Sequence, residues 1–222
     1  EMCIRDRYYV DSKNVTSNIW TEVKFYYTFD CQDYLSGPVI YFKFNVTDTH
    51  NFRAETSVEN LTLEKDDVSF SFVEGVGETV SREGENYKRF TVIINDSDKG
   101  ETVGKDVNGT FYFTYDGINY DNGHNASTNE SGYMSYNFDP NCSYNVGSQF
   151  WKVEVKGNSC YKDTTSSTQS YSIFGQLKNN LQLPSKNSIF NVTQSIIIRF
   201  NTTSDCSDEG LIPNACLLYT SD

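Results

Sequence analysis

Short runs of alternating hydrophobic and polar residues recur along the chain. Phe, Tyr, Val and Ile occupy every second position within a run, which is the period of a strand with one buried face. Clusters of Gly, Asn and Asp, such as those at 116–123 and 156–159, separate the runs and are typical of turns. The pattern predicts ten strands, at 18–29, 38–46, 58–63, 67–73, 88–95, 109–116, 132–138, 148–156, 170–176 and 194–200.

One face of each predicted strand carries its large apolar side chains, so we expect that face to line a core. The residues predicted to point inward are Val23, Phe25, Tyr27, Tyr41, Phe44, Phe70, Phe72, Phe90, Val92, Ile94, Phe111, Phe113, Tyr115, Trp151, Val153, Val155, Ile196 and Ile198. Only 174–181 offers a short helix candidate, and the aromatic content of 15% also favours strands. The sequence therefore predicts an all-β fold.

The chain contains internal repeats. FYYTFDCQDY at 25–34 matches FYFTYDGINY at 111–120, an offset of 86 residues, and IIIRFNTTSDC at 196–206 is a weaker third copy. The first and third copies are the closest pair, since each has SKN upstream (12–14 and 185–187) and Asp-Cys after the strand.

A repeat of about 85 residues built from alternating strands has the size of an immunoglobulin-like sandwich. Over residues 12–206 the pattern resembles the tandem immunoglobulin-like repeats of extracellular adhesins and surface fibres, although the Cys…Trp…Cys core of antibody domains is missing. The resemblance implies tandem immunoglobulin-like β-sandwich domains. The expected division is an N-terminal segment at 1–14, one repeat at 15–103, a second at 104–190, and the first strand of a further repeat in 191–222.

Charge narrows the range of partners. The net charge is −12 and the isoelectric point about 4.6, so the surface should repel nucleic acid and anionic lipid. No apolar run is long enough to span a membrane. Residues 1–7 and 216–222 resemble translated sequencing-adapter read-through, so we expect the natural chain to continue on both sides and Cys3 and Cys216 to be foreign to it.

N-glycosylation sequons indicate the compartment. Ten occur, well above what 22 Asn and 44 Ser or Thr residues would give by chance, and such acceptors lie on the surface of secretory-pathway proteins. We expect covalent N-glycans and an extracellular or cell-surface location. The acceptors are Asn14, Asn45, Asn60, Asn95, Asn108, Asn125, Asn129, Asn141, Asn191 and Asn201.

Four cysteines lie between the two adapter-like ends: Cys31, Cys142, Cys160 and Cys206. An extracellular compartment favours disulfides among them, with three pairings open. Cys142 and Cys160 flank one predicted strand, so joining them requires the chain to double back. This favours a Cys160–Cys206 bond. If the interval that starts at Cys31 repeats, it leaves an odd thiol for a cross-link between units.

Two Asp-rich loops are candidate calcium sites, and we expect no other cofactor. Asp96 and Asp98 stand at alternate positions before a glycine, and Asp116 and Asp121 lie in a second loop. Carboxylate oxygens at such spacing suit Ca²⁺, while the same residues are also ordinary turn formers.

No catalytic motif is present: the chain lacks G-x-S-x-G, H-E-x-x-H and a phosphate loop, and His50 and His124 stand alone in loop sequences. We therefore expect a non-enzyme. The leading hypothesis is a structural subunit of a secreted glycoprotein filament or adhesive array that self-associates through edge strands or neighbouring repeats. The alternative is a receptor or lectin-like ectodomain, for which the candidate sugar-stacking residues are Tyr8, Tyr9, Tyr34, Tyr120, Tyr133, Tyr136, Tyr144 and Tyr161.

Overall fold

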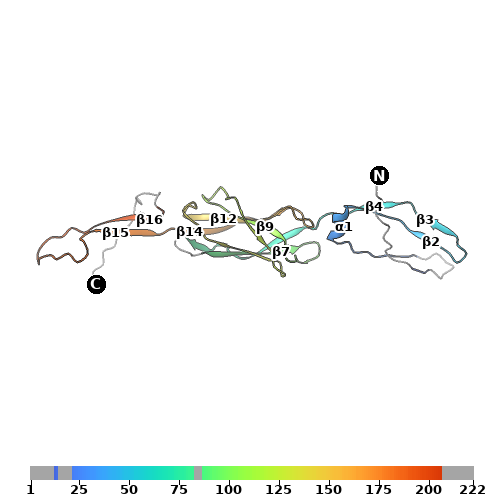
Figure 1. Ribbon diagram of the computed structural model, residues 1–222, viewed down its shortest axis with the longest axis horizontal. Coiled ribbons are helices and arrows are strands. Elements are labelled where there is room, and N and C mark those ends of the chain that lie inside the picture. Colours follow the sequence, from blue (N-terminus) through green and yellow to red (C-terminus); the bar gives the residue numbers. More distant parts are fainter. Residues whose placement is uncertain (1–12, 15–21, 83–86, 207–222) are drawn as a thin grey trace. The chain divides into compact units, whose positions relative to one another are not determined.

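The computed structural model describes residues 13–14, 22–82 and 87–206 (Figure 1). The chain divides into an N-terminal unit, Glu1–Lys65, and a C-terminal unit, Asp66–Asp222. The fold is all-β, as predicted, with a single helix in the described part of the chain. The adapter-like ends at 1–7 and 216–222 lie outside the described residues.

The N-terminal unit consists of one short helix and two antiparallel strand pairs. Helix α1 (Cys31–Ser36) begins at Asp30, whose carboxylate accepts hydrogen bonds from the N–H groups of Gln32 and Asp33, an arrangement that caps the helix. The strands are β1 (Val39–Phe42), β2 (Asn45–Thr47), β3 (Arg53–Glu55) and β4 (Glu59–Thr62). β1 pairs with β4 and β2 pairs with β3. None of the described residues in this unit is fully buried.

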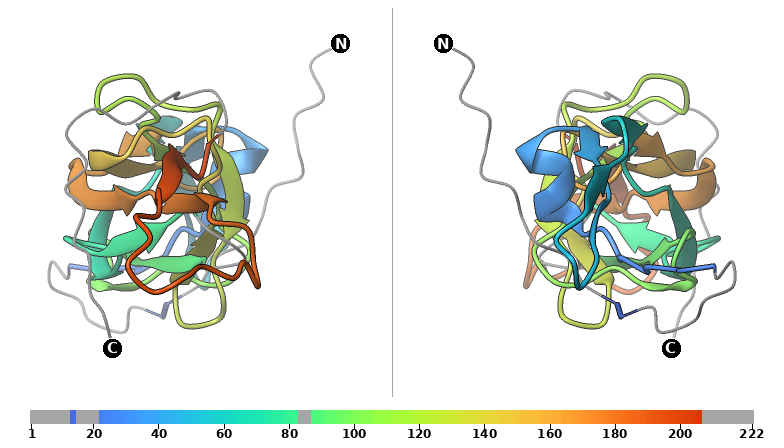
Figure 2. Two further views of the ribbon diagram at one scale, coloured as in Figure 1. Left: turned by 90° about the vertical axis from the view of Figure 1, so that its left-hand side faces the viewer. Right: turned by 90° about the vertical axis from the view of Figure 1, so that its right-hand side faces the viewer.

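Two sheets of the C-terminal unit form the layers of a sandwich, seen end-on in Figure 2. One sheet has the order β11-β7-β5, with β8 on β7, and the other has the order β10-β9-β12-β14-β6, with β13 on β12. All pairs are antiparallel except β14 with β6. The strands are β5 (Val68–Glu74), β6 (Thr79–Ser81), β7 (Lys88–Asp96), β8 (Glu101–Thr102), β9 (Asn108–Phe113), β10 (His124–Ser127), β11 (Tyr133–Phe138), β12 (Gly147–Val155), β13 (Thr164–Thr165), β14 (Gln169–Phe174), β15 (Leu177–Leu183) and β16 (Arg199–Ser204).

The core of the C-terminal unit lies between these two sheets. Phe90 of β7 packs edge-to-face against Phe113 of β9 at 4.9 Å and against Trp151 of β12 at 5.1 Å. These aromatic contacts join the two layers and, together with the area they bury, hold the sandwich closed. The Trp151 indole N–H donates to the carbonyl of Gly75, so its polar edge is satisfied at the core boundary. Gly75 has a φ of +101°, and a Cβ there would meet the Phe90 ring at 2.2 Å.

Strands β15 and β16 form a separate antiparallel pair, here called the ribbon, which directly follows β14. Every residue of β15 is exposed, and Leu181 keeps 65% of its surface accessible. The ribbon therefore presents apolar side chains that the sandwich core does not cover.

Six strands of the sandwich, β5, β7, β9, β11, β12 and β14, confirm the predicted runs. The predicted helix at 174–181 is wrong, because its residues end β14 and form β15, which the ladder with β16 holds extended. The predicted strand at 38–46 is two strands, and residues 22–29 of the predicted strand at 18–29 form none. The last predicted strand, at 194–200, is displaced toward 199–204.

The predicted boundary at 103/104 does not separate two sandwiches. Strand β7 of the predicted first repeat pairs with β11 of the predicted second repeat, and residues from both line one core. Sequence order misled the prediction because antiparallel sandwiches pair strands that are far apart along the chain. The inward predictions are confirmed for β7, for β12 and for Phe111 and Phe113 of β9. The residues predicted inward that are exposed are Val23, Tyr27, Tyr41, Phe44, Tyr115, Ile196 and Ile198.

Candidate functional site

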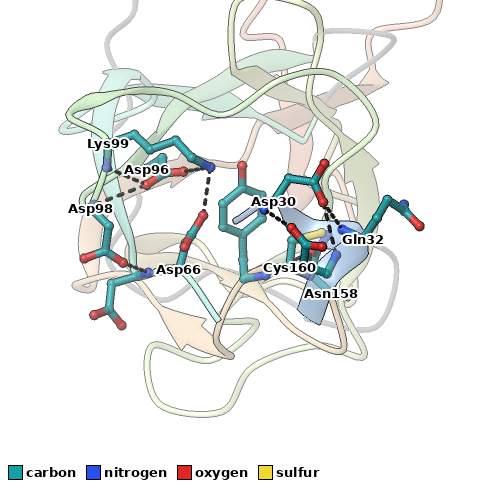
Figure 3. Close-up of polar contacts among 11 residues, drawn as sticks. Asp30, Gln32, Asp66, Asp96, Asp98, Lys99, Asn158 and Cys160 are labelled. Carbon is teal, nitrogen blue, oxygen red and sulfur yellow. Dashed lines mark hydrogen bonds and ion pairs between the residues drawn. The ribbon is translucent and has the colours of Figure 1, made fainter. Parts of the chain in front are cut away.

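The first Asp-rich loop holds a lysine among its carboxylates (Figure 3). The Lys99 ammonium lies 2.8 Å from Asp66 Oδ2 and 3.1 Å from Asp96 Oδ2. The hydrogen bonds that Lys99 donates to these two carboxylates raise its pKa above the usual value. Asp98 instead accepts the backbone N–H of Asp67 at 2.7 Å. The oxygens expected to bind calcium are thus engaged by protein donors.

The second Asp-rich loop uses its carboxylates to shape the backbone. Asp116 accepts hydrogen bonds from the N–H groups of Ile118 and Asn119 and from the Asn119 side chain, and these bonds lower its pKa. Asp121 accepts from Gly123 N–H and lies in a different cluster. Within residues 13–14, 22–82 and 87–206, no group of three or more His, Cys, Asp or Glu side chains is arranged to hold a metal ion.

Asp121 joins a cluster that the sequence did not indicate. Its Oδ2 lies 3.0 Å from His124 Nε2 and accepts the Tyr144 hydroxyl at 2.8 Å, while the His124 ring stacks on Tyr136 at 4.5 Å. Burial, and then the bond to Asp121, raises the pKa of Tyr144. His124 is therefore partly enclosed on β10, unlike the isolated loop histidine that we expected. His50 is exposed in the loop between β2 and β3.

The cysteines are paired differently from the expected way. Cys142 bonds to Cys206, so the favoured Cys160–Cys206 pairing is wrong. Strand β16 runs back along β15 and brings Cys206 to Cys142, in the loop before β12. The prediction considered only the length of the strand between Cys142 and Cys160, and that length says nothing about where Cys206 lies. Cys31 and Cys160 are also disulfide-bonded, so none of the four is the odd thiol that we expected.

A buried ion pair lies beside this disulfide. Asp205 Oδ1 accepts from Arg82 Nη2 at 2.8 Å, and the two side chains are only 7% and 1% exposed. Burial by itself would raise the pKa of Asp205, but hydrogen bonds from Arg82, Ser204 and the Gln176 backbone lower it overall. Arg82 also donates to the carbonyl of Tyr144. We call Arg82, Cys142, Asp205 and Cys206 the junction, because they fix the end of the ribbon to the sandwich.

The sequons lie mostly on the surface. Eight of the ten asparagines are exposed, and Asn95 and Asn201 are half-buried. Asn95 donates its amide to Ser71, and the Asn201 side-chain oxygen is the one buried side-chain polar atom that lacks a hydrogen-bond partner in the described residues. Asn108 and Asn125 line one shallow hollow on the outer face of β9 and β10.

The outer face of β9 and β12 carries an aromatic and cationic cluster. Lys152 Nζ lies 4.5 Å from the centre of the Tyr120 ring and 5.7 Å from that of Tyr112, whose hydroxyl donates to Glu154. Tyr120 alone among the tyrosines proposed for sugar stacking belongs to this cluster. Tyr136, Tyr144 and Tyr161 instead pack against the sandwich core, and Tyr8 and Tyr9 lie outside the described residues.

No protein-family model matches this chain, and no curated protein matches it in sequence. In the described residues, no helix has the length and hydrophobicity needed to cross a membrane.

Proposed function

We propose that the chain is a repeating structural subunit of an extracellular, N-glycosylated filament or adhesive array. The observation that carries the proposal is the pair of matching segments at 23–31 and 198–206, each ending in Asp-Cys, on either side of one β-sandwich in the sequence. A chain that repeats the same connecting segment around a sandwich has the organisation of a tandem array.

The strand order supports an immunoglobulin-like assignment for the sandwich. If β5, β7 and β11 are taken as strands A, B and E, then β9, β12 and β14 take the places of C, F and G in the facing sheet. The edge strand β10 then corresponds to the extra strand of variable-type domains. This arrangement resembles the modules from which extracellular adhesins and surface fibres are built, and it supports one such domain at 66–174.

Disulfides and exposed sequons support the extracellular location. Disulfides persist in oxidising compartments, and the exposed asparagines can carry glycans without disturbing the core.

Electron microscopy of native material tests the proposal. Negative-stain images should show filaments with a regular repeat, and non-reducing intact-mass analysis should show a loss of mass on enzymatic removal of N-glycans. Filaments should also be imaged after the N-glycans are removed under non-reducing conditions. This control shows whether removal of the glycans alone changes the filaments while the disulfides stay intact. Dispersed particles would overturn the filament, and an unchanged mass would overturn the extracellular location.

One observation favours the alternative of a ligand-binding ectodomain. Tyr112, Lys152 and Tyr120 form a partly exposed aromatic surface on the outer sheet, and tyrosine faces of this kind can stack on sugar rings. A glycan array probed with the wild-type chain and with Tyr120→Ala would separate the two functions. Binding that the substitution abolishes would favour the ectodomain, and no binding would exclude this surface as a lectin site.

A further inference from the structure

A nine-residue segment occurs twice without a gap. Residues 23–31 read VKFYYTFDC and residues 198–206 read IRFNTTSDC, so both have a β-branched residue, a cation, Phe, Thr and a final Asp-Cys at matching positions. Phe25 thus corresponds to Phe200, and Phe29 corresponds to Ser204.

The two copies differ in structure. In the second copy, residues 199–204 form β16 and pair with β15. In the first copy, residues 24–29 form no strand, and no bond between backbone groups joins them to another segment of the described chain. The Lys24 carbonyl accepts a hydrogen bond from the Lys13 side chain. The Tyr26 side chain there is 84% exposed. The two similar segments therefore differ in pairing: residues 199–204 are paired with β15, whereas residues 24–29 are paired with no strand of the described chain.

We infer that residues 24–29 are a docking edge for a strand with the sequence of β15, supplied by a second copy of this chain. This inference rests on the proposed function and names the surfaces through which subunits would associate. Addition of a strand to an open edge uses main-chain hydrogen bonds for affinity and alternate side chains for selection.

The ladder between β15 and β16 shows which side chains would meet. Leu181 lies opposite Phe200, and Leu177 lies opposite Ser204. If residues 24–29 lie along the other edge of β15 at the positions that correspond to β16, Leu181 is opposite Phe25 and Leu177 is opposite Phe29. Both contacts are then apolar, whereas the present ladder has one apolar and one polar contact. Leu177 and Leu181 are more than half exposed in the ribbon, which leaves them available.

Charge favours the same partner. The stretch 176–204 contains Lys178, Lys186 and Arg199 and no acidic residue, although the whole chain has a net charge of −12. Residues 22–65 contain seven acidic and four basic side chains. Opposite charge on the two surfaces accelerates encounter and disfavours the pairing of two identical ends.

The second edge of β15 makes the contact geometrically available. In the described residues, β15 is bordered by β16 on one side only. A ribbon can therefore keep its own ladder while β15 accepts residues 24–29 of another copy. Such a head-to-tail contact joins two different surfaces and extends into a chain of subunits.

Binding of a fluorescein-labelled peptide of residues 176–184 to the full-length chain tests the inference. Fluorescence anisotropy should show saturable binding. Of the two peptides with Asn179→Pro and Asn180→Pro, the one whose lost N–H faces residues 24–29 should bind at least about tenfold more weakly, because proline cannot donate to a ladder. The chain variants Tyr26→Pro and Tyr27→Pro complete the test. N–H groups alternate along a strand, so one of the two prolines removes a donor that faces the peptide.

The matched controls are Tyr26→Ala and Tyr27→Ala, which keep the backbone donors, and near-ultraviolet circular dichroism confirms that the sandwich is intact in every variant. Absence of peptide binding, or equal binding by all four variants, would overturn the docking edge. Filaments that form in native material despite that result would leave the proposed function standing. Peptide binding by a protein that forms no filaments would support the docking edge and overturn the proposed filament.

Discussion

Residues 25–30 and 111–116 have nearly the same sequence, FYYTFD and FYFTYD, and different structures. Phe111 and Phe113 lie in β9 and are completely buried between the two sheets. At the matching positions, Phe25 is half-buried and Tyr27 is 53% exposed, and no strand forms. An aromatic alternating sequence thus gives a strong preference for extended structure, but its burial depends on the partners that the rest of the fold supplies.

The partners of the second segment can be named. Strand β9 is bordered by β10 and β12, and the Thr114 hydroxyl bonds to Gln149, which is itself buried. Phe113 then stacks on Phe138 of the opposite sheet at 3.9 Å. In the first segment, Phe25 contacts Phe44, and the Tyr27 ring contacts Phe29. Both contacts join side chains within the N-terminal unit.

The largest expected effect comes from truncating the matching aromatic in each segment. Phe113→Ala should lower the free energy of unfolding by about 3–5 kcal/mol, because it empties a fully buried site. Tyr27→Ala should leave the denaturation midpoint of the sandwich unchanged. Urea denaturation followed by tryptophan fluorescence in a Trp20→Phe background, in which Trp151 is the reporter, measures both variants. Equal losses would mean that the two segments are buried alike.

The segment at 198–206 allows a second comparison, between Asp205 and the matching Asp30 of the first segment. Asp205→Ala leaves Arg82 buried without its carboxylate and should cost about 3 kcal/mol. Asp30→Ala, at the equivalent position, removes only a helix cap and should cost about 1 kcal/mol. Denaturation of the two variants under non-reducing conditions checks this order, and the reverse order would show that the junction adds little.

Acid should weaken the third copy selectively. Because the folded-state pKa of Asp205 is below its unfolded value of about 3.9, its contribution is present above that pH and is lost as the pH falls through the folded value. The stability difference between wild type and Asp205→Ala should therefore shrink below about pH 4. A difference that stays constant from neutral pH to about pH 2 would contradict the assignment.

The smallest expected effect is that of calcium. Asp96, Asp98, Asp116 and Asp121 have protein donors in place, and the Lys99 ammonium already lies against Asp96 in the first loop. Millimolar calcium should leave the melting temperature of the wild-type chain unchanged in scanning calorimetry, with magnesium as the control cation. A rise specific to calcium would show that a carboxylate exchanges its donors for the ion.

The sequence was a good guide to the sandwich strands and a poor guide to their pairing. Alternation identified β7, β9 and β12, because their buried residues are apolar and stand at every second position. It missed β10, whose sequence HNAS has no apolar alternation and which borders one strand only. The domain boundary failed because repeat spacing says nothing about which distant strands share a ladder.

The candidate sites divide in the same way. Sequons are local motifs, and their exposure follows from the turns and strand edges where they lie. The junction could not be foreseen, since Arg82 and Asp205 are 123 residues apart and neither stands in a recognisable motif. The Cys142–Cys206 bond forms because β16 runs back along β15 and brings Cys206 near Cys142. The sequence of β15 does not indicate that pairing.

The Cys142–Cys206 bond also changes how the chain would carry tension. The two cysteines are 64 residues apart, and the segment between them contains β12, β14 and the whole ribbon. A pull applied beyond Cys206 passes through the sulfur–sulfur bond to Cys142 and bypasses that segment. The parallel ladder of β14 with β6 would then be spared the load, and the length released when the sandwich is stretched would be shortened by those residues.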